Sequence, residues 1–462
     1  MRMTPLAIAM MLTWGASASA FAADTSELTL LKQQMEALQN QMQVLQNKLG
    51  TMAAAPQPST TTSASSESPL STKIGGVDAT LYGNIDVSTD VVNDGKESIS
   101  QVSSNLSYFG IRGGRDLGSS GYRAIYQIET LVNVSGTPTE TGALGSRNSF
   151  VGVQGNFGKL MLGKTDTPYK RATAAMDPFS ASVGDYNSIM GNTGGDLRAE
   201  FDARLPHSIF YDSPKLGGFS VNALVSPGQK LGNLAGSDKY AFAQGEKVCS
   251  GATPGSSGAL PDPGSPICND GAFSTAYSVA LNYESGPWLG TFAYERHGAV
   301  DRTSDTGGVV SDESAAKIGM TYRFKSNRLS AIYEKLYRNG GGVDPTLDER
   351  QRNGVYVSDV QELGNHTDLM VAWAHAGQTP GSPDFGTLDN TANMYSVGLK
   401  YHYDKMTSMY VVGSVLSQGE GGHYALGASG HGVAIAAPRD DTGATIGGKT
   451  LNAISVGMQH VF

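Results

Sequence analysis

The sequence predicts an all-β fold: a 16-stranded antiparallel transmembrane β-barrel, preceded by a short α-helical coiled coil. Three observations support this prediction. After Lys73, apolar and polar residues alternate with a period of two, as in strands with one face on lipid and the other on water. Short breaks rich in turn residues alternate with long polar breaks along the chain. After the amino-terminal region, no stretch is apolar for about 20 residues, the length of a transmembrane helix.

Residues 1–22 have the layout of a secretory signal peptide. Arg2 precedes an apolar run from Pro5 to Trp14, and small residues follow as Ala20-Phe21-Ala22. We therefore expect the chain to be exported. Its formal net charge of −9 argues against nucleic acid as a partner.

Residues 24–52 carry a heptad repeat, because apolar residues recur at spacings of three and four. The core positions are Leu28, Leu31, Met35, Leu38, Met42, Leu45 and Leu49. We expect an oligomeric coiled coil; the alternative is one amphipathic helix packed on its own barrel. Residues 53–72, rich in Ala, Pro, Ser and Thr, predict a flexible linker.

Residues 73–462 are expected to form the barrel itself. Seven short breaks are expected at 114–120, 155–158, 213–217, 285–287, 325–327, 363–365 and 404–407. Eight long ones are expected near 89–103, 134–146, 165–205, 226–272, 297–314, 339–351, 378–391 and 417–450. These fifteen connections imply sixteen strands, with both termini on the short-turn side. We therefore expect the termini and the coiled coil to lie in the periplasm.

Several short motifs occur in a particular order and spacing along this region. They include Thr80-Leu81-Tyr82-Gly83, Tyr108-Phe109-Gly110-Ile111-Arg112-Gly113, Phe150-Val151-Gly152-Val153, Tyr211-Asp212-Ser213-Pro214 and the ending Val456-Gly457-Met458-Gln459-His460-Val461-Phe462. Together they resemble the general outer-membrane porins of Gram-negative proteobacteria. The resemblance covers about residues 79–462. The heptad segment is an addition that most members lack.

The resemblance implies a homotrimer in the Gram-negative outer membrane, in contact with its lipid and lipopolysaccharide. Small hydrophilic solutes would diffuse passively through each barrel. The terminal Phe462 would be the insertion signal read by the barrel-assembly machinery. Gln459 and Phe210 stand where many members have basic residues, so ion selectivity does not carry over from the family.

The resemblance also implies that the long connection at 165–205 folds into the lumen and narrows it. Opposed charges across a narrow aqueous gap create a transverse field that orients polar solutes. The candidate charges are Asp177, Asp185, Asp196, Glu200 and Arg198 in this loop, and Arg112, Arg123 and Lys159 on the neighbouring wall. The loop contains six acidic and four basic residues, while the three wall residues are basic. We therefore expect only a mild ion preference.

Cys249 and Cys268 lie in the fourth long break of an exported chain, which predicts a disulfide. No further ligands with suitable spacing stand nearby, so we expect no metal site. The sequence lacks a G-x-S-x-G elbow, an H-E-x-x-H motif and a phosphate-binding loop. We therefore expect a protein that is not an enzyme and needs no cofactor.

Three functions remain open at this point. The first is a general diffusion porin. The second is a substrate-biased channel for phosphate, organic anions or sugars. The third is an envelope tether in which the coiled coil grips peptidoglycan.

Overall fold

The computed structural model describes residues 70–135, 144–192, 201–227, 273, 275–301, 310–339, 351–379, 388–427, 431 and 446–462. They belong to one compact unit, Glu67–Phe462. Within these ranges no helix has the length and hydropathy needed to span a membrane. The predicted signal peptide (1–22), the heptad segment (24–52), and most of the predicted linker lie outside the described residues.

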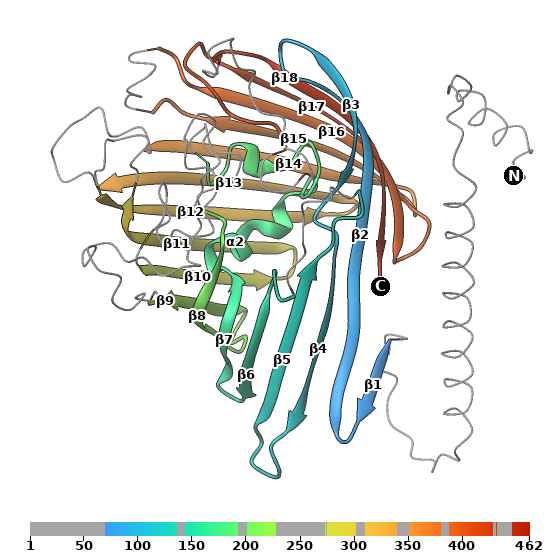
Figure 1. The fold of residues 1–462 in the computed structure, drawn as a ribbon, viewed down its shortest axis with the longest axis vertical. Coiled ribbons are helices and arrows are strands. Elements are labelled where there is room, and N and C mark those ends of the chain that lie inside the picture. The colour runs from blue at the N-terminus through green and yellow to red at the C-terminus, as the bar shows by residue number, and fades with distance from the viewer. Residues whose placement is uncertain are drawn as a thin grey trace, which may run out of the picture. The chain divides into compact units, whose positions relative to one another are not determined.

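The described ranges form one antiparallel sheet of 18 strands (Figure 1). The strands follow one another in chain order around the sheet, and neighbours in sequence are neighbours in space. Their bounds are β1 Ser71–Ile74, β2 Val77–Asn93, β3 Ser98–Ser104, β4 Tyr108–Asp116, β5 Arg123–Leu131, β6 Ser149–Gly155, β7 Gly158–Asp166, β8 Arg204–Asp212, β9 Phe219–Ser226, β10 Thr275–Ser285, β11 Trp288–Asp301, β12 Val310–Phe324, β13 Asn327–Asn339, β14 Arg352–Leu363, β15 Thr367–Ala376, β16 Ala392–His402, β17 Thr407–Gln418 and β18 Leu451–Val461.

These 18 described strands make a barrel wall of 16. β3 and β4 are successive parts of one wall strand, because both pair with β2, β3 along residues 87–93 and β4 along residues 78–84. β1 is a short arm that pairs with the start of β2, beyond the end of β18. The predicted 16-stranded antiparallel barrel is therefore confirmed. Ser71 and Thr72, which the sequence placed in the linker, belong to β1.

The barrel closes where β18 pairs with β2. Just past this ladder, the Gly83 N–H donates to the carbonyl of Phe462 at 2.9 Å, and the Phe462 N–H donates to the carbonyl of Gly83 at 3.0 Å. A Cβ added at Gly83 would lie 2.4 Å from the Phe462 ring. Glycine at this position lets the terminal aromatic ring lie directly against β2.

The alternation of side chains decides which residues face the interior. On β13, Leu329 and Tyr333 are exposed on the outer face, whereas Ser330 and Glu334 are buried on the inner face. The same alternation appears in β18, where Ile454 and the apolar residues two and four positions later are exposed. The period of two in the sequence therefore corresponds to the outer and inner faces of the wall.

All seven expected short connections occur as turns, but the first expected long break, at 89–103, is wrong. β2 continues to Asn93 and β3 begins at Ser98, which leaves only a tight turn. Asp90 and Ser103 are buried on the inner face, and Ser103 Oγ donates to Asp90 at 2.6 Å. Because strand residues on the lumen side are polar, this segment looks like a loop in sequence.

The height of the wall is uneven. β5 to β9 contain 7–9 residues each, whereas β11 to β14 contain 12–15. At about 3.3 Å per residue, the longest of these strands exceeds the shortest by roughly 26 Å. The barrel therefore has a low side and a high side.

Candidate pore constriction

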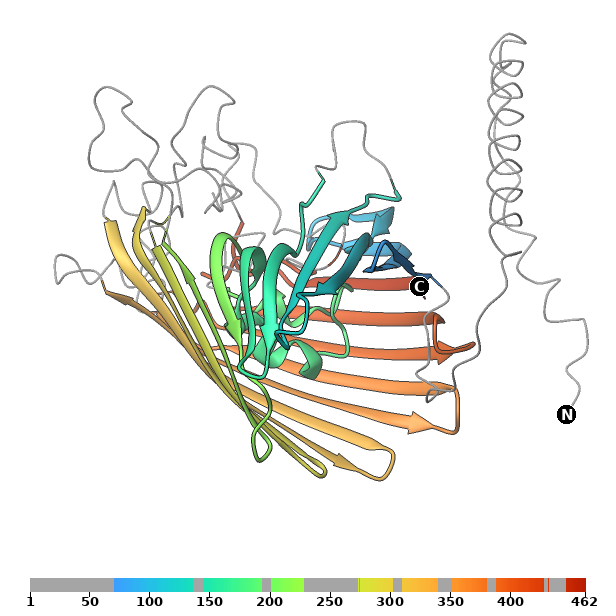
Figure 2. The same cartoon turned by 90° about the horizontal axis from the view of Figure 1, so that it is seen from below.

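The connection between β7 and β8 is called here the inner loop, and its described residues lie inside the curve of the sheet (Figure 2). It contains α2 Pro168–Thr173 and two 3-10 turns, η2 Ala174–Met176 and η3 Tyr186–Ser188. The Thr167 side chain caps α2 by accepting a hydrogen bond from the Lys170 N–H at 3.2 Å. The flanking strands extend to Asp166 and from Arg204, so the loop is slightly shorter than the expected 165–205.

The inner loop packs on the high side of the barrel through apolar contacts. Met176, Phe179 and Ile189 are buried in one cluster with side chains of β13 to β17. Small wall residues permit this approach: a Cβ at Gly319 would lie 2.8 Å from Met176 Sδ, and one at Gly398 would lie 3.1 Å from the Phe179 ring. The loop is thus attached to one wall.

Buried charges also hold the inner loop to this wall. Lys317 on β12 forms an ion pair with Asp202, and both side chains are almost inaccessible to solvent. The Tyr186 hydroxyl donates to Asp202 at 2.8 Å. On β13, Glu334 accepts hydrogen bonds from the Tyr169 hydroxyl at 2.7 Å and the Gly191 N–H at 2.8 Å. Charged groups without access to water are stable only when paired in this way.

Asp177 and Asp185, expected to line the constriction, lie on the wall side of the loop and are 6% and 3% exposed. Asp177 accepts hydrogen bonds from the Phe179 and Tyr186 N–H groups, at 2.9 and 3.0 Å. Asp185 accepts from the Ala181 and Asn187 N–H groups, at 2.8 and 2.9 Å.

Burial raises the pKa of both loop carboxyls, Asp177 and Asp185, and the neighbouring Asp177 raises that of Asp185 further. The hydrogen bonds of Asp177 and Asp185 fix the conformation of the loop, and neither carboxylate faces the aqueous gap. This corrects the expectation that these two residues line the constriction.

A segment of the last long connection covers the inner loop. Tyr424 and Leu426 are buried in the same apolar cluster as the loop. The Gly427 N–H donates to Ser188 Oγ at 2.9 Å, and His431 Nε2 lies 3.2 Å from Asp90 on β2. This second layer occupies part of the barrel interior above the loop.

Across the interior, β2, β4 and β5 carry a cluster of aromatic and charged side chains, called here the wall cluster. Glu129 accepts hydrogen bonds from the Tyr82 hydroxyl at 3.0 Å and from Arg147 Nε at 2.7 Å. The Arg147 guanidinium lies 4.6 Å from the ring centre of Tyr108, and that of Arg112 lies 4.6 Å from the ring centre of Tyr82. Rings and carboxylate together hold both guanidinium groups in place.

The two ends of the inner loop are held by further ion pairs. Asp166 lies 2.9 Å from Arg204 and 3.5 Å from Lys170. Arg171, on α2, reaches Asp212 on β8 with two hydrogen bonds of 2.9 and 3.0 Å. These contacts set where the loop enters and leaves the wall.

The other expected constriction residues fall into two groups. Arg123 pairs with Asp116 at 2.8 Å, beside the short turn between β4 and β5, and Lys159 stands directly after the turn between β6 and β7. Both therefore lie near the short-turn rim, and Lys159 pairs in register with Asp212, the residue that Arg171 of the inner loop contacts. Asp196, Arg198 and Glu200, as well as Cys249 and Cys268, lie outside the described residues, so the disulfide stays a prediction.

Sequence reasoning missed Arg147, which stands at the edge of an expected loop, two residues before β6. It also missed the buried partners of the inner loop, Lys317 and Tyr356. The signal for Tyr82 and Glu129 was present, since both lie on lumen-facing positions of alternating strands.

Comparisons with known proteins agree with this architecture. A family model described as Gram-negative porin matches residues 50–420. The major outer membrane protein P.IB of Neisseria meningitidis serogroup B is 27% identical over 356 residues, which cover 74% of this chain and 89% of the relative.

Two solved structures resemble this fold at lower identity. An anion-selective porin from Comamonas acidovorans has a TM-score of 0.63 at 19% identity, covering 84% of this chain and 100% of that chain. Salmonella typhi OmpF in complex with daunomycin has a TM-score of 0.57 at 12% identity, covering 84% and 98%.

Proposed function

This chain belongs to the Gram-negative porin family, and from that premise we propose that its channel favours small anions. As a member of this family it is a passive outer-membrane channel for small hydrophilic solutes and not an enzyme. The proposal concerns which solutes pass most easily. A channel biased toward one class of solute was one of the three functions left open by the sequence, which also predicted only a mild ion preference. The present proposal is the anion-selective version of that channel, and it replaces the mild preference.

The distribution of acidic side chains on the inner loop supports this proposal. Asp177, Asp185 and Asp202 are all buried against the wall. Asp166 is mostly covered and lies between two basic side chains. Little negative charge from the described part of the loop therefore faces water.

The single observation that carries the proposal is the position of Arg112. Its side chain is exposed on the inner face of β4, stacked on Tyr82. Among the described residues it has no carboxylate partner within 4 Å, unlike Arg147, whose charge is matched by Glu129. Arg171 on α2 is also 38% exposed, although it is paired with Asp212. Among the described residues, the unpaired water-facing charge between the inner loop and this wall is therefore positive.

Local charges decide selectivity despite the chain's net charge of −9. Salt screens distant charges beyond about 8–10 Å, whereas a narrow gap bounded by protein keeps nearby interactions strong. An exposed guanidinium at the gap then attracts anions more effectively than remote carboxylates repel them. The Comamonas porin is described as anion-selective, but our proposal depends on the residues of this chain.

Reversal potentials in planar bilayers under a salt gradient test this proposal. We expect wild-type channels to prefer chloride over potassium, and Arg112→Gln to shift the potential toward potassium. Lys325→Gln is the control, because Lys325 lies in a short turn beside Phe324, outside the lumen. A cation-selective wild type, or an Arg112→Gln channel with unchanged selectivity, would contradict the proposal.

We also propose that the channel is a homotrimer that associates through the outer face of β2 and β4 to β8. Exposed outward residues on β2 and β4 to β8 are mainly aliphatic: Leu81, Phe109, Ile111, Ile128, Val151, Val153, Leu160, Leu162 and Ile209. Those on β10 to β17 include many aromatic residues: Tyr277, Tyr283, Trp288, Phe292, Phe324, Tyr333, Tyr337, Tyr395 and Tyr401. Aromatic belts are typical of lipid-facing walls, so the aliphatic face is the better candidate for subunit contacts.

Two bulky substitutions compare these faces. Val151 on β6 and Val397 on β16 are 59% and 54% exposed, so they form a matched pair. Val151→Trp should lower the temperature at which trimers dissociate on a semi-native gel, whereas Val397→Trp should leave it nearly unchanged. The reverse order would place the interface on the aromatic face.

The heptad segment, residues 24–52, would then extend the trimer into the periplasm as a three-stranded coiled coil. Its helices would grow from three barrels already held together, and Leu and Met at its a positions do not require a dimer. Analytical ultracentrifugation of a peptide covering residues 24–52 tests this. A peptide that stays monomeric at high concentration, with trimers equally stable after deletion of the segment, would contradict it.

A further inference from the structure

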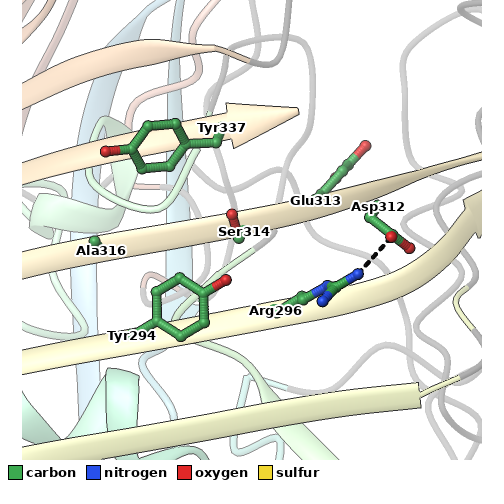
Figure 3. A pocket seen from close by; sticks show the side chains of 7 residues that line it. All are labelled: Tyr294, Arg296, Asp312, Glu313, Ser314, Ala316 and Tyr337. Atoms are coloured by element: carbon green, nitrogen blue, oxygen red, sulfur yellow. Dashed lines mark hydrogen bonds and ion pairs between the residues drawn. The ribbon is translucent and has the colours of Figure 1, made fainter. Parts of the chain in front are cut away.

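An apolar patch lies on the inner face of β5 and β6, where the wall surrounds the lumen. Rings on the outer face have lipid beside them: Figure 3 shows two of these, Tyr294 and Tyr337, where they line a pocket across β11 to β13. The interior of such barrels is polar. Ile125 and Phe150 are nevertheless apolar, and both are only half-buried. Apolar side chains that keep contact with lumen water indicate a surface for solutes that are themselves partly apolar.

The pairing of the strands places both side chains on the inner face. Arg112, which faces the lumen, pairs in register with Gln127, and Gln127 pairs with Phe150. Residues paired in register point to the same face of a sheet. Ile125 stands two residues before Gln127 on β5, so it points inward as well. Ile128, on the opposite face of β5, is 54% exposed.

Buried side chains hold the Phe150 ring in place. Its centre lies 5.4 Å from that of the Phe210 ring, at an interplanar angle of 88°. Met161 and Phe210 are 2% and 3% exposed, and both Ile125 and Phe150 pack against the cluster that contains them. An edge-to-face contact favours one orientation of the two rings. The patch is therefore preformed, which lowers the cost of binding a solute.

One uncompensated positive charge lies beside this patch. The Arg112 guanidinium stacks on Tyr82 and has no carboxylate within 4 Å among the described residues. Gln127 stands between Arg112 and Phe150, and its neutral amide donates to the carbonyl of Asn148 at 3.1 Å. Adjacent strands lie about 4.8 Å apart, so Arg112 and Phe150 leave the wall roughly 10 Å apart. A solute with an anionic end and a compact apolar body can contact both.

We propose that Arg112, Ile125 and Phe150 form a binding subsite for organic monocarboxylates whose carboxylate is attached to an aromatic ring or a short alkyl chain. The carboxylate accepts hydrogen bonds from the planar guanidinium. The apolar body lies on Ile125 and Phe150, and water leaves both surfaces. The inference rests on the proposed anion preference and names the class of anion that the channel favours.

The charge around the subsite favours a monoanion. The other guanidinium of the wall cluster, that of Arg147, is matched by Glu129 at 2.7 Å. A doubly charged phosphate therefore meets only one uncompensated cation, and its hydrated oxygens gain nothing from Ile125 and Phe150. Chloride is attracted to Arg112 but gains nothing from the apolar patch either. Only a carboxylate with an apolar body uses both parts of the subsite.

Block of single-channel chloride current by benzoate tests the proposal, with acetate and benzamide as separate probes. Full-length wild-type channels are measured in symmetric chloride at neutral pH, and the dissociation constant follows from the dependence of the block on probe concentration. Benzoate should bind about 10-fold more tightly than acetate, because only benzoate carries a ring to the patch. Benzamide has the ring without the charge and should bind about 10-fold more weakly than benzoate.

Two truncations and one matched control separate the patch from the charge. Phe150→Ala and Ile125→Ala should each reduce the preference for benzoate over acetate to about 3-fold and leave acetate binding unchanged. Arg112→Gln should weaken the binding of both carboxylates by about 10-fold. Ile128→Ala is the control, because it makes the same change on the opposite face of the same strand, and its preference should equal that of wild type. The heat-induced gel shift confirms that each variant is folded.

A preference for benzoate over acetate that neither truncation changes would overturn the proposal, as would benzamide binding as tight as that of benzoate. Equal losses in Ile128→Ala and Ile125→Ala would also overturn it, since the contact would then not lie in the lumen. The preference is measured in symmetric salt, whereas ion selectivity is a reversal potential under a gradient. A cation-selective wild type that keeps the truncation-sensitive preference would therefore contradict the proposed anion preference alone.

Discussion

The hydroxyl of Tyr356 on β14 donates a hydrogen bond of 2.8 Å to the carboxylate of Asp177 in the inner loop. This bond joins the loop to the wall, and two backbone N–H groups complete the shell of Asp177. The Asp177 carboxylate therefore holds the loop in position, and this role affects both permeation and stability.

We expect the double variant Asp177→Asn/Asp185→Asn to leave the reversal potential nearly unchanged, since neither side chain faces the gap. Asp177→Ala should act differently: it leaves three donors without a partner, at about 1–3 kcal/mol each. The loop should then fluctuate, and single-channel recordings should show more open-channel noise. A large shift toward anions in the double Asn variant would mean that these carboxylates do face the solute.

The Lys317–Asp202 pair gives a second prediction. Lys317→Met leaves the Asp202 carboxylate buried without its cation, which costs about 3–5 kcal/mol. Adding Asp202→Leu removes the unpaired charge, so the double variant should recover part of the loss. Denaturant unfolding in detergent, followed by the gel shift, measures both. If the double variant is no more stable than Lys317→Met, the broken ion pair is not the main cause of the lost stability.

Barrel closure can be tested at Gly83. Gly83→Ala places a methyl group against the Phe462 ring, and overpacking of this kind costs about 1–3 kcal/mol. The control is Gly290→Ala on β11, where an added Cβ has nothing within 4 Å. Only the first variant should lower the unfolding midpoint. Equal effects of the two substitutions would show that the terminal ring does not restrict this position.

The segment that covers the inner loop should restrict current. Leu426 is fully buried in the cluster that this segment shares with the inner loop, so Leu426→Asp should release the segment and raise single-channel conductance. Leu388→Asp is the control, because Leu388 is 42% exposed. An unchanged conductance in Leu426→Asp would show that the covering layer does not narrow the pathway.

Some features of the candidate site could be predicted from the sequence. The lumen-facing positions of Arg112 and Glu129 follow from parity along single strands, and parity is a local property. Their partners did not follow, since Arg147 comes from a connection and Tyr82 from a strand that reaches the cluster only through pairing of β2 with β4. The segment around Asp90 was misjudged because polar lumen residues have the composition of a loop.

The sequence by itself determined the number of wall strands, the seven short turns and, for the strands with a clear alternation, the face on which their residues lie. These features depend on residues that are neighbours in the chain, and a wall in contact with lipid imposes the period of two on every strand. Only the tertiary structure decided which charges face the water. Asp177, Asp185 and Arg112 are all charged, but the two aspartates are buried by their neighbours and Arg112 is exposed. Tyr356 and Lys317 contact the inner loop from strands far along the chain. Burial of a charged side chain is a property of the folded loop on its wall, so it could not be inferred before that packing was known.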